Sequence, residues 1–196
     1  MLDPTWPSTA EEPYDPPLSA DGVEQARRLG RRLAPEGIQS IVSSPFLRAI
    51  QTAHHINEAL GAPIFLEPGF GEWLTERSFE RLPRLQALEV LRAQYPALRD
   101  GYPAAGVFQY PESAGQLRAR TKHALEALLD KLEGTLLVVG HAASVAAMGL
   151  VDERVERIEC PLCALFCLEH DGSGWRLAIN AEVTHVGERM ACFTFP

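Results

Sequence analysis

The chain has 196 residues and a formal net charge of −8 at pH 7, with 46% hydrophobic and 22% charged residues. This length and composition predict one globular domain over residues 1–196, with a core large enough to fold without disulfide bonds or bound metal ions. The negative charge argues against a nucleic-acid partner, and no apolar run is long enough to cross a bilayer. Four cysteines without a zinc pattern, and a polar start broken by prolines, predict a reduced, cytoplasmic protein.

The N-terminal segment divides into an arm and a helix. Residues 1–17 contain five prolines, which predict an extended arm because proline cannot continue a helix or a central strand. Ser19 follows as a helix N-cap. An apolar stripe with helical spacing then predicts a helix from about residue 20 to residue 33.

A short strand and a second helix follow. The strand is predicted over Ile38–Ser43, and Ser44-Pro45 is a strong start signal for the helix, with serine as the cap and proline in the first helical position. Gly61 is predicted to end this helix. Arg48 lies in the first turn after the strand, and therefore at the carboxyl edge of the sheet. Its planar guanidinium suits the binding of phosphate oxygens in pairs.

An irregular segment follows the next strand, Ile64–Glu67. We interpret residues 68–111 as an insertion that caps the strand ends, because long loops at that edge usually form the walls of a site. One helix is predicted in it, from about residue 79 to residue 95, ended by Pro96. A flexible turn at the start of the insertion delivers the carboxylate of Glu72 beside an aromatic residue.

The last part of the chain contains a helix, a buried strand and a hairpin. The helix is predicted at about 113–133, the strand at 135–139, and the hairpin strands at 164–168 and 175–184. The alternation of strands and helices predicts a three-layer α/β/α sandwich with a mostly parallel sheet. His141 follows the buried strand beside the N–H groups of a new helix, which is where an α/β sheet binds phosphate.

Four stretches, taken in order, resemble the histidine phosphatase superfamily, also called the phosphoglycerate mutase-like family. They are Tyr14-Asp15-Pro16-Pro17-Leu18-Ser19, Ser43-Ser44-Pro45-Phe46-Leu47-Arg48, Glu72-Trp73-Leu74 and Gly140-His141-Ala142. The first and third resemble the branch that includes protein-tyrosine phosphatases of the suppressor-of-T-cell-signalling type. The resemblance covers nearly the whole chain and implies a phosphoglycerate mutase-like fold.

The resemblance implies a phosphatase that hydrolyses phosphomonoesters in two steps through a phosphohistidine. By this resemblance, Arg48 and His141 bind the phosphate, and Glu72 or a neighbour on its loop protonates the leaving oxygen. We expect a small-molecule or protein phosphoester as substrate, no cofactor and, in the absence of a His/Asp/Glu cluster at ligand spacing, no metal. The sequence also allows a homodimer.

The family's defining Arg-His-Gly motif, which ends its first central strand and supplies the nucleophile, is absent from the sequence. We interpret the five histidines other than His141 as solvated or structural, so none replaces the nucleophile. The first central strand is expected to be missing, and the strand 135–139 is then expected to lack a partner on one side or to borrow one from another chain.

Two hypotheses account for the missing motif. In the preferred one, the reading frame begins upstream of Met1 and the full-length protein is the enzyme, because a sheet without its central strand leaves unpaired backbone groups. In the other, this form is a catalytically inactive phosphate-binding or interaction module. A phosphoglycerate mutase is a further alternative. It would need a basic cluster for a second anionic group, and the arginines of the insertion are instead spread along it.

Overall fold

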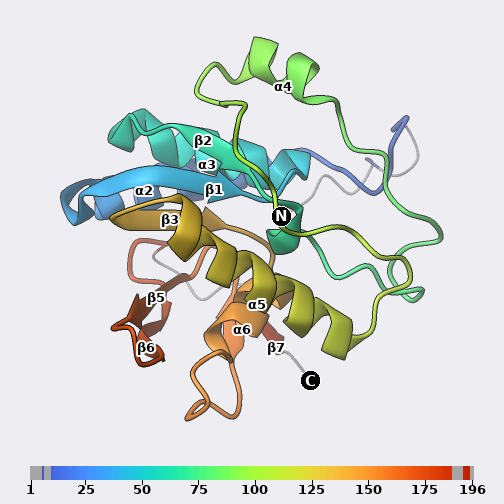
Figure 1. The fold of residues 1–196 in the computed structure, drawn as a ribbon. Coiled ribbons are helices and arrows are strands. Elements are labelled where there is room, and N and C mark those ends of the chain that lie inside the picture. The colour runs from blue at the N-terminus through green and yellow to red at the C-terminus, as the bar shows by residue number, and fades with distance from the viewer. Residues whose placement is uncertain (1–5, 7–9, 187–191, 195–196) are drawn as a thin grey trace.

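A three-stranded parallel sheet forms the centre of the molecule (Figure 1). The computed structural model describes residue 6 and the ranges 10–186 and 192–194. The strands are β1 (Ile38–Ser43), β2 (Ile64–Leu66) and β3 (Thr135–Val139), and they pair in the order β2-β1-β3. Because all three run in the same direction, their carboxyl ends meet at one edge of the sheet.

Helices cover both faces of this sheet (Figure 1). Helices α2 (Ala20–Leu33) and α3 (Leu47–Leu60) pack on one face in a single apolar cluster that includes Ile41. Helix α5 (Ala114–Lys131) covers the other face in a cluster that includes Val42, while α6 (Ala142–Gly149) begins just after β3. Adjacent residues of one strand thus face opposite layers. The expected three-layer sandwich with a parallel sheet is confirmed.

Several helix ends follow their local sequence signals. The Ser19 hydroxyl accepts a hydrogen bond from the Gly22 N–H at 3.2 Å, and α2 spans the predicted residues. Gly61 ends α3 with a φ of 67°, a left-handed conformation that favours glycine. At the start of α5, Ser113 and Gln116 form a reciprocal capping box. These bonds are made between near neighbours, which is why the sequence could predict them.

The start of α3 differs from the prediction. The helix begins at Leu47 after an extended Phe46, two residues later than the Ser44-Pro45 signal indicated. The Leu47 N–H donates to Asp15 Oδ1 at 2.7 Å, so a carboxylate from the N-terminal arm satisfies the helix start. Ser44 instead places its hydroxyl 2.8 Å from His141 Nε2. A long-range contact therefore replaced the local cap.

The helix predicted at 79–95 is also shorter in the structure. Helix α4 spans only Leu88–Gln94, and the chain before it is irregular. Pro83 lacks the N–H that a helix needs at that position. The Tyr110 hydroxyl donates to the Phe79 carbonyl at 2.7 Å, so a side chain from elsewhere in the insertion binds this backbone instead of a helical partner. The predicted end before Pro96 is confirmed.

The remaining elements form two antiparallel pairs and two short 3₁₀ helices. Strands β5 (Leu165–His170) and β6 (Trp175–Glu182) form the predicted hairpin. Strand β4 (Glu159–Pro161) pairs with β7 (Cys192–Thr194), which was not predicted. The 3₁₀ helices are η1 (Ala34–Glu36) and η2 (Pro68–Phe70).

Strand β3 has one unpaired edge within the described part of the chain. It pairs there with β1 alone, as expected for a sheet that lacks a further strand on that side. The β5–β6 hairpin is a separate sheet, although its Leu168 and Trp175 pack in the same apolar cluster as Val138. Among the described residues, no helix has the length and apolar character needed to span a membrane.

Candidate functional site

The three site residues predicted from the sequence meet at the carboxyl edge of the sheet. Arg48 lies in the first turn of α3, Glu72 follows η2, and His141 is the N-cap of α6. Arg48 Nη2 is 3.1 Å from Glu72 Oε2, and His141 Nδ1 is 3.3 Å from the same oxygen. One carboxylate oxygen therefore bridges an arginine and a histidine from separate elements.

The His141 ring is held on both of its nitrogens. Its side chain is only 4% exposed, with Nδ1 facing Glu72 and Nε2 facing the Ser44 hydroxyl. The ionised carboxylate can only accept a hydrogen bond, so Nδ1 carries a proton. In the neutral ring, Nε2 then accepts from Ser44. The backbone N–H of His141 donates to Ser144 Oγ at 3.0 Å, and this hydroxyl in turn reaches the Phe70 carbonyl.

The charges at the site oppose the effect of burial. Burial alone would raise the pKa of Glu72, but His141, Arg48 and the Trp73 N–H lower it to about 2. Burial lowers the pKa of His141, with Arg48 adding to this effect and Glu72 opposing it. The resting site therefore contains an ionised Glu72 between a permanent cation and a hydrogen-bond donor.

Aromatic rings form the apolar wall of this site. The Arg48 guanidinium lies 4.8 Å from the centre of the Phe46 ring, and the His141 ring meets Phe46 edge to face at 5.0 Å. Phe108, from the insertion, packs edge to face against Phe46 at 5.9 Å. This wall reduces the screening of the charges by water, which strengthens their interactions with an anion.

Arg120 supports the loop that carries Glu72, and the sequence analysis missed it. Its side chain is 6% exposed and forms a two-point ion pair with Glu112, with both nitrogen–oxygen distances at 2.8 Å. It also donates to the carbonyls of Pro68, Gly69 and Glu72 at 2.8–3.2 Å. An arginine within the apolar stripe of α5, three residues after Leu117, was the available signal.

Two of the other histidines make contacts away from this site. His185 Nε2 lies 2.8 Å from the Cys163 carbonyl, and the His170 ring packs against Trp175. His54 and His55 lie further along α3, where they form a cluster with Glu58. Among the described residues this is the one group that offers three metal-ligating side chains close together, and the predicted phosphate site is not part of it.

This arrangement can bind a tetrahedral oxyanion. A phosphoryl oxygen that took the place of Glu72 Oε2 would meet the Arg48 guanidinium and the His141 N–H, both already positioned. Release of Glu72 from these partners would free a carboxyl group beside the bound anion. The site thus combines anion binding with a group that can transfer a proton.

Comparisons with known proteins show the family and the fold. Residues 5–182 match the profile of the histidine phosphatase superfamily (branch 1). A probable phosphoglycerate mutase GpmB of Serratia proteamaculans is 29% identical over 183 residues, covering 88% of this chain and 84% of that protein. The human ubiquitin-associated and SH3 domain-containing protein A is 32% identical over 143 residues, covering 67% of this chain but only 22% of that protein.

A solved structure shows the same fold. The ecdysone phosphate phosphatase of Bombix mori, crystallised with tungstate, superposes with a TM-score of 0.65. It is 22% identical, and the alignment covers 87% of this chain and 76% of that one. The similarity supports the phosphoglycerate mutase-like arrangement predicted from the sequence.

Proposed function

Because the chain belongs to the histidine phosphatase superfamily, we propose that it is the greater part of a phosphomonoesterase in which Arg48 and His141 hold the transferred phosphoryl group. Glu72 protonates the oxygen of the leaving group. The convergence of Arg48 and His141 on one oxygen of Glu72 supports this proposal, because a guanidinium and an imidazole lie within 3.3 Å of a single point.

The low pKa of Glu72 fits the role of a proton donor once substrate is bound. In the resting site, the carboxylate is ionised because it lies against Arg48 and His141. A bound phosphoryl dianion would neutralise those partners and place negative charge beside the carboxylate, and both effects raise its pKa. Substrate binding would thus give Glu72 the proton that it passes to the leaving oxygen.

The 196 residues contain no Arg-His-Gly motif, so this proposal assigns the nucleophilic histidine to a segment that precedes them. In the mechanism implied by the family, a histidine nitrogen attacks phosphorus, the ester bond breaks, and the leaving oxygen takes the proton of Glu72. Water then attacks the phosphohistidine and releases phosphate. We propose that a preceding strand ending in Arg-His-Gly lies beside the unpaired edge of β3 and supplies this histidine.

The reading frame upstream of Met1 offers the first test. If it encodes Arg-His-Gly, we expect the extended protein to hydrolyse p-nitrophenyl phosphate and to form an acid-labile phosphoenzyme. A correctly folded extended protein with no turnover of any phosphomonoester would contradict the proposal. An in-frame stop codon upstream of Met1, with no Arg-His-Gly motif after it, would favour the alternative, a phosphate-binding or interaction module.

Glu72→Gln separates the role in proton transfer from the role in binding. We expect the variant to bind inorganic phosphate at least as tightly as the wild type, because phosphate no longer displaces a carboxylate from Arg48. Hydrolysis of an alkyl phosphate should fall about 100-fold or more, and hydrolysis of p-nitrophenyl phosphate much less, since nitrophenolate leaves without a proton. Equal losses for the two substrates would exclude Glu72 as the proton donor.

The substrate class, the partners and the location remain proposals from the sequence. We propose a small-molecule or protein phosphoester as substrate, a cytoplasmic location, and neither nucleic acid nor membrane as partner. One similar protein is named a phosphoglycerate mutase and another a phosphatase. A mutase activity would be recognised by transfer between positions of phosphoglycerate rather than release of phosphate.

A further inference from the structure

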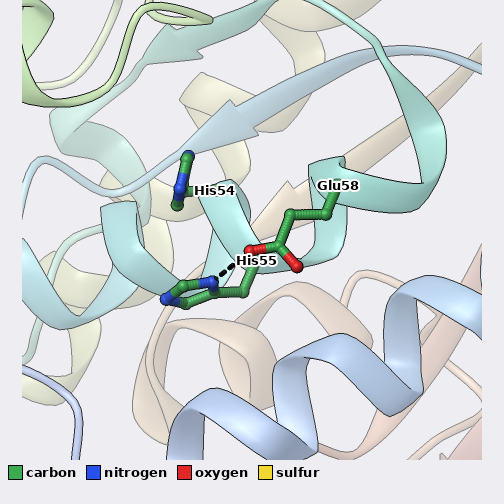
Figure 2. Close-up of side chains that lie close together, drawn as sticks. All are labelled: His54, His55 and Glu58. Carbon is green, nitrogen blue, oxygen red and sulfur yellow. Dashed lines mark hydrogen bonds and ion pairs between the residues drawn. The ribbon is translucent and has the colours of Figure 1, made fainter.

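Helix α3 carries a second group of reactive side chains, two turns beyond Arg48. His54, His55 and Glu58 place one potential ligand atom each within 4.8 Å of the others. Figure 2 shows the His55 ring and the Glu58 carboxylate turned toward one another, with the His54 ring standing apart from them on the same helix. His55 Nδ1 lies 2.7 Å from Glu58 Oε1. The sequence analysis did not identify this cluster, because i, i+1, i+4 is not a common ligand spacing.

The pKa shifts of Glu58 and His54 suit a cation bound at the place where the three side chains meet. Hydrogen bonds from Arg27 and His55 lower the pKa of Glu58 to about 2, so its carboxylate is ionised near neutral pH. Burial lowers the pKa of His54, and the neighbouring His55 adds to this effect. A neutral imidazole has the lone pair that a metal ion requires. The cluster therefore offers two imidazoles and one anion.

The cluster is also accessible. A surface hollow of about 210 Å³ is lined by His55 and Glu58, together with Arg27, Arg31 and Ala59. The His55 side chain is 17% exposed and the Glu58 side chain is 41% exposed, so an ion reaches both from solvent. His54 does not line this hollow, so the hollow gives access to the His55 and Glu58 donors, with room for water molecules beside them.

We propose that His54, His55 and Glu58 form a binding site for a divalent transition-metal ion such as Zn²⁺. Imidazole and carboxylate donors suit Zn²⁺, Cu²⁺ and Ni²⁺, whereas Mg²⁺ and Ca²⁺ prefer a shell of oxygen atoms. A tetrahedral site needs donor atoms about 3.3–3.5 Å apart, so side-chain rotations have to bring these donors, now within 4.8 Å of one another, closer together. An ion at His55 Nδ1 takes the place of the proton between this nitrogen and Glu58, and the neutral ring then carries its proton on Nε2. The site does not depend on the proposed phosphatase activity.

Arg27 provides a specific way to test this site. Its Nε lies 2.9 Å from Glu58 Oε2 and its Nη2 lies 3.2 Å from Oε1, so the guanidinium competes with a cation for the carboxylate. If Glu58 is a ligand, Arg27→Gln should bind the metal more tightly than the wild type. If Arg27, Glu58 and His55 form only a surface ion-pair network, the substitution should not change metal affinity.

The experiment is a calorimetric titration of metal-free protein without an affinity tag, in a reducing buffer, with Zn²⁺ and separately with Mg²⁺. We expect one Zn²⁺ site that His55→Gln weakens about tenfold or more and that His54→Gln also weakens. The matched control is His123→Gln, which removes an exposed histidine of α5. Circular dichroism confirms that each variant is folded.

The comparison between variants also accounts for the cysteines, since thiolate binding of Zn²⁺ is the same in all of them. Binding of Mg²⁺ should be absent at concentrations that saturate the Zn²⁺ site. If wild type and His55→Gln bind Zn²⁺ equally, or if His54→Gln has no effect, the three-ligand site is wrong. An unchanged affinity in Arg27→Gln would also overturn it.

Discussion

Two regions of the molecule each contain an arginine and a histidine around a glutamate. The site triad is Arg48–Glu72–His141 at the strand ends, and the surface triad is Arg27–Glu58–His55 on helices α2 and α3. Both glutamates have a pKa lowered to about 2, but for different reasons. At Glu72, His141 and Arg48 lower the pKa against a large opposing effect of burial. At Glu58, hydrogen bonds from Arg27 and His55 lower the pKa, and burial opposes them only a little.

The two triads therefore differ in what the loss of a partner costs. The side chains of Arg48, Glu72 and His141 are 19%, 25% and 4% exposed, whereas those of Arg27, Glu58 and His55 are 42%, 41% and 17% exposed. Water replaces a lost partner on the surface, and the energy change there is small. In the site triad, water replaces a lost partner less completely, so the loss of a partner costs more free energy. Chemically similar groups thus respond differently to the loss of a partner, according to how far water reaches them.

The largest expected effect concerns Arg120, which binds the loop that carries Glu72 of the site triad. Arg120→Gln should lower the free energy of unfolding by about 3–5 kcal/mol, because Glu112, whose side chain is 1% exposed, loses its ion-pair partner. Urea denaturation measures this change. The control is Lys122→Gln on the same helix, whose pair with Glu126 is exposed and should matter far less. Similar losses in both variants would show that burial does not set the cost.

Arg48→Gln tests the site triad itself. We expect binding of inorganic phosphate to weaken about 100-fold, because the glutamine cannot supply a charged, two-point contact to the anion. Calorimetric titration at low ionic strength measures the affinity. Arg28→Gln is the control, since this exposed arginine pairs with Glu24 on the outer side of α2. Retained phosphate affinity in Arg48→Gln would place the anion elsewhere.

Asp15 extends the comparison to a carboxyl group for which burial outweighs its partners. Burial raises its pKa from 3.8 to about 6, despite the Leu47 N–H and the nearby Arg48. A raised folded-state pKa stabilises the protein below the unfolded pKa, and this contribution is lost as the pH rises through about 6. Relative to Asp15→Asn, the wild type should lose about 2 kcal/mol of unfolding free energy between pH 4 and pH 7.

Denaturation at several pH values measures that difference. The asparagine keeps an oxygen that can accept from Leu47, so the two proteins differ mainly in titration. Parallel stability curves for wild type and variant across this range would mean that the Asp15 pKa is not raised.

The smallest effect is expected at the surface triad. Glu58→Gln should change the free energy of unfolding by less than about 1 kcal/mol, because solvent screens its pairs with Arg27 and His55. Thermal unfolding in low and high salt measures the change and its screening. A loss as large as that of Arg120→Gln would remove the distinction between the two triads.

Much of the fold followed from local patterns. The apolar run of β3 and the stripe of α2 predicted both elements with the residues observed, and Ser19 and Gly61 marked helix ends correctly. The convergence of Arg48, Glu72 and His141 was also predicted, because each follows a parallel strand and such strands end at one edge. Their chemical roles remain predictions.

Long-range contacts decided the features that the sequence analysis missed. Ser44 had the pattern of a helix cap, yet its hydroxyl faces His141, and Asp15 from the N-terminal arm binds the start of α3 instead. Arg120 had no local signal beyond an unexpected charge on an apolar stripe. His141 is far from Ser44 in the sequence, and Asp15 is far from Leu47. The carbonyls that Arg120 binds are also distant from it, so no pattern of spacing reveals these contacts.

The sequence by itself determined the order of elements, the parallel sheet and the edge at which Arg48, Glu72 and His141 meet, because hydrophobic periodicity and short-range hydrogen bonds depend on neighbouring residues. The tertiary structure alone decided which carboxylates are buried, which cations face them, and which strand edge has no partner among the described residues. Burial and pairing depend on segments far apart in the chain. They determine the charge of Glu72, Asp15 and His141, on which the proposed chemistry depends.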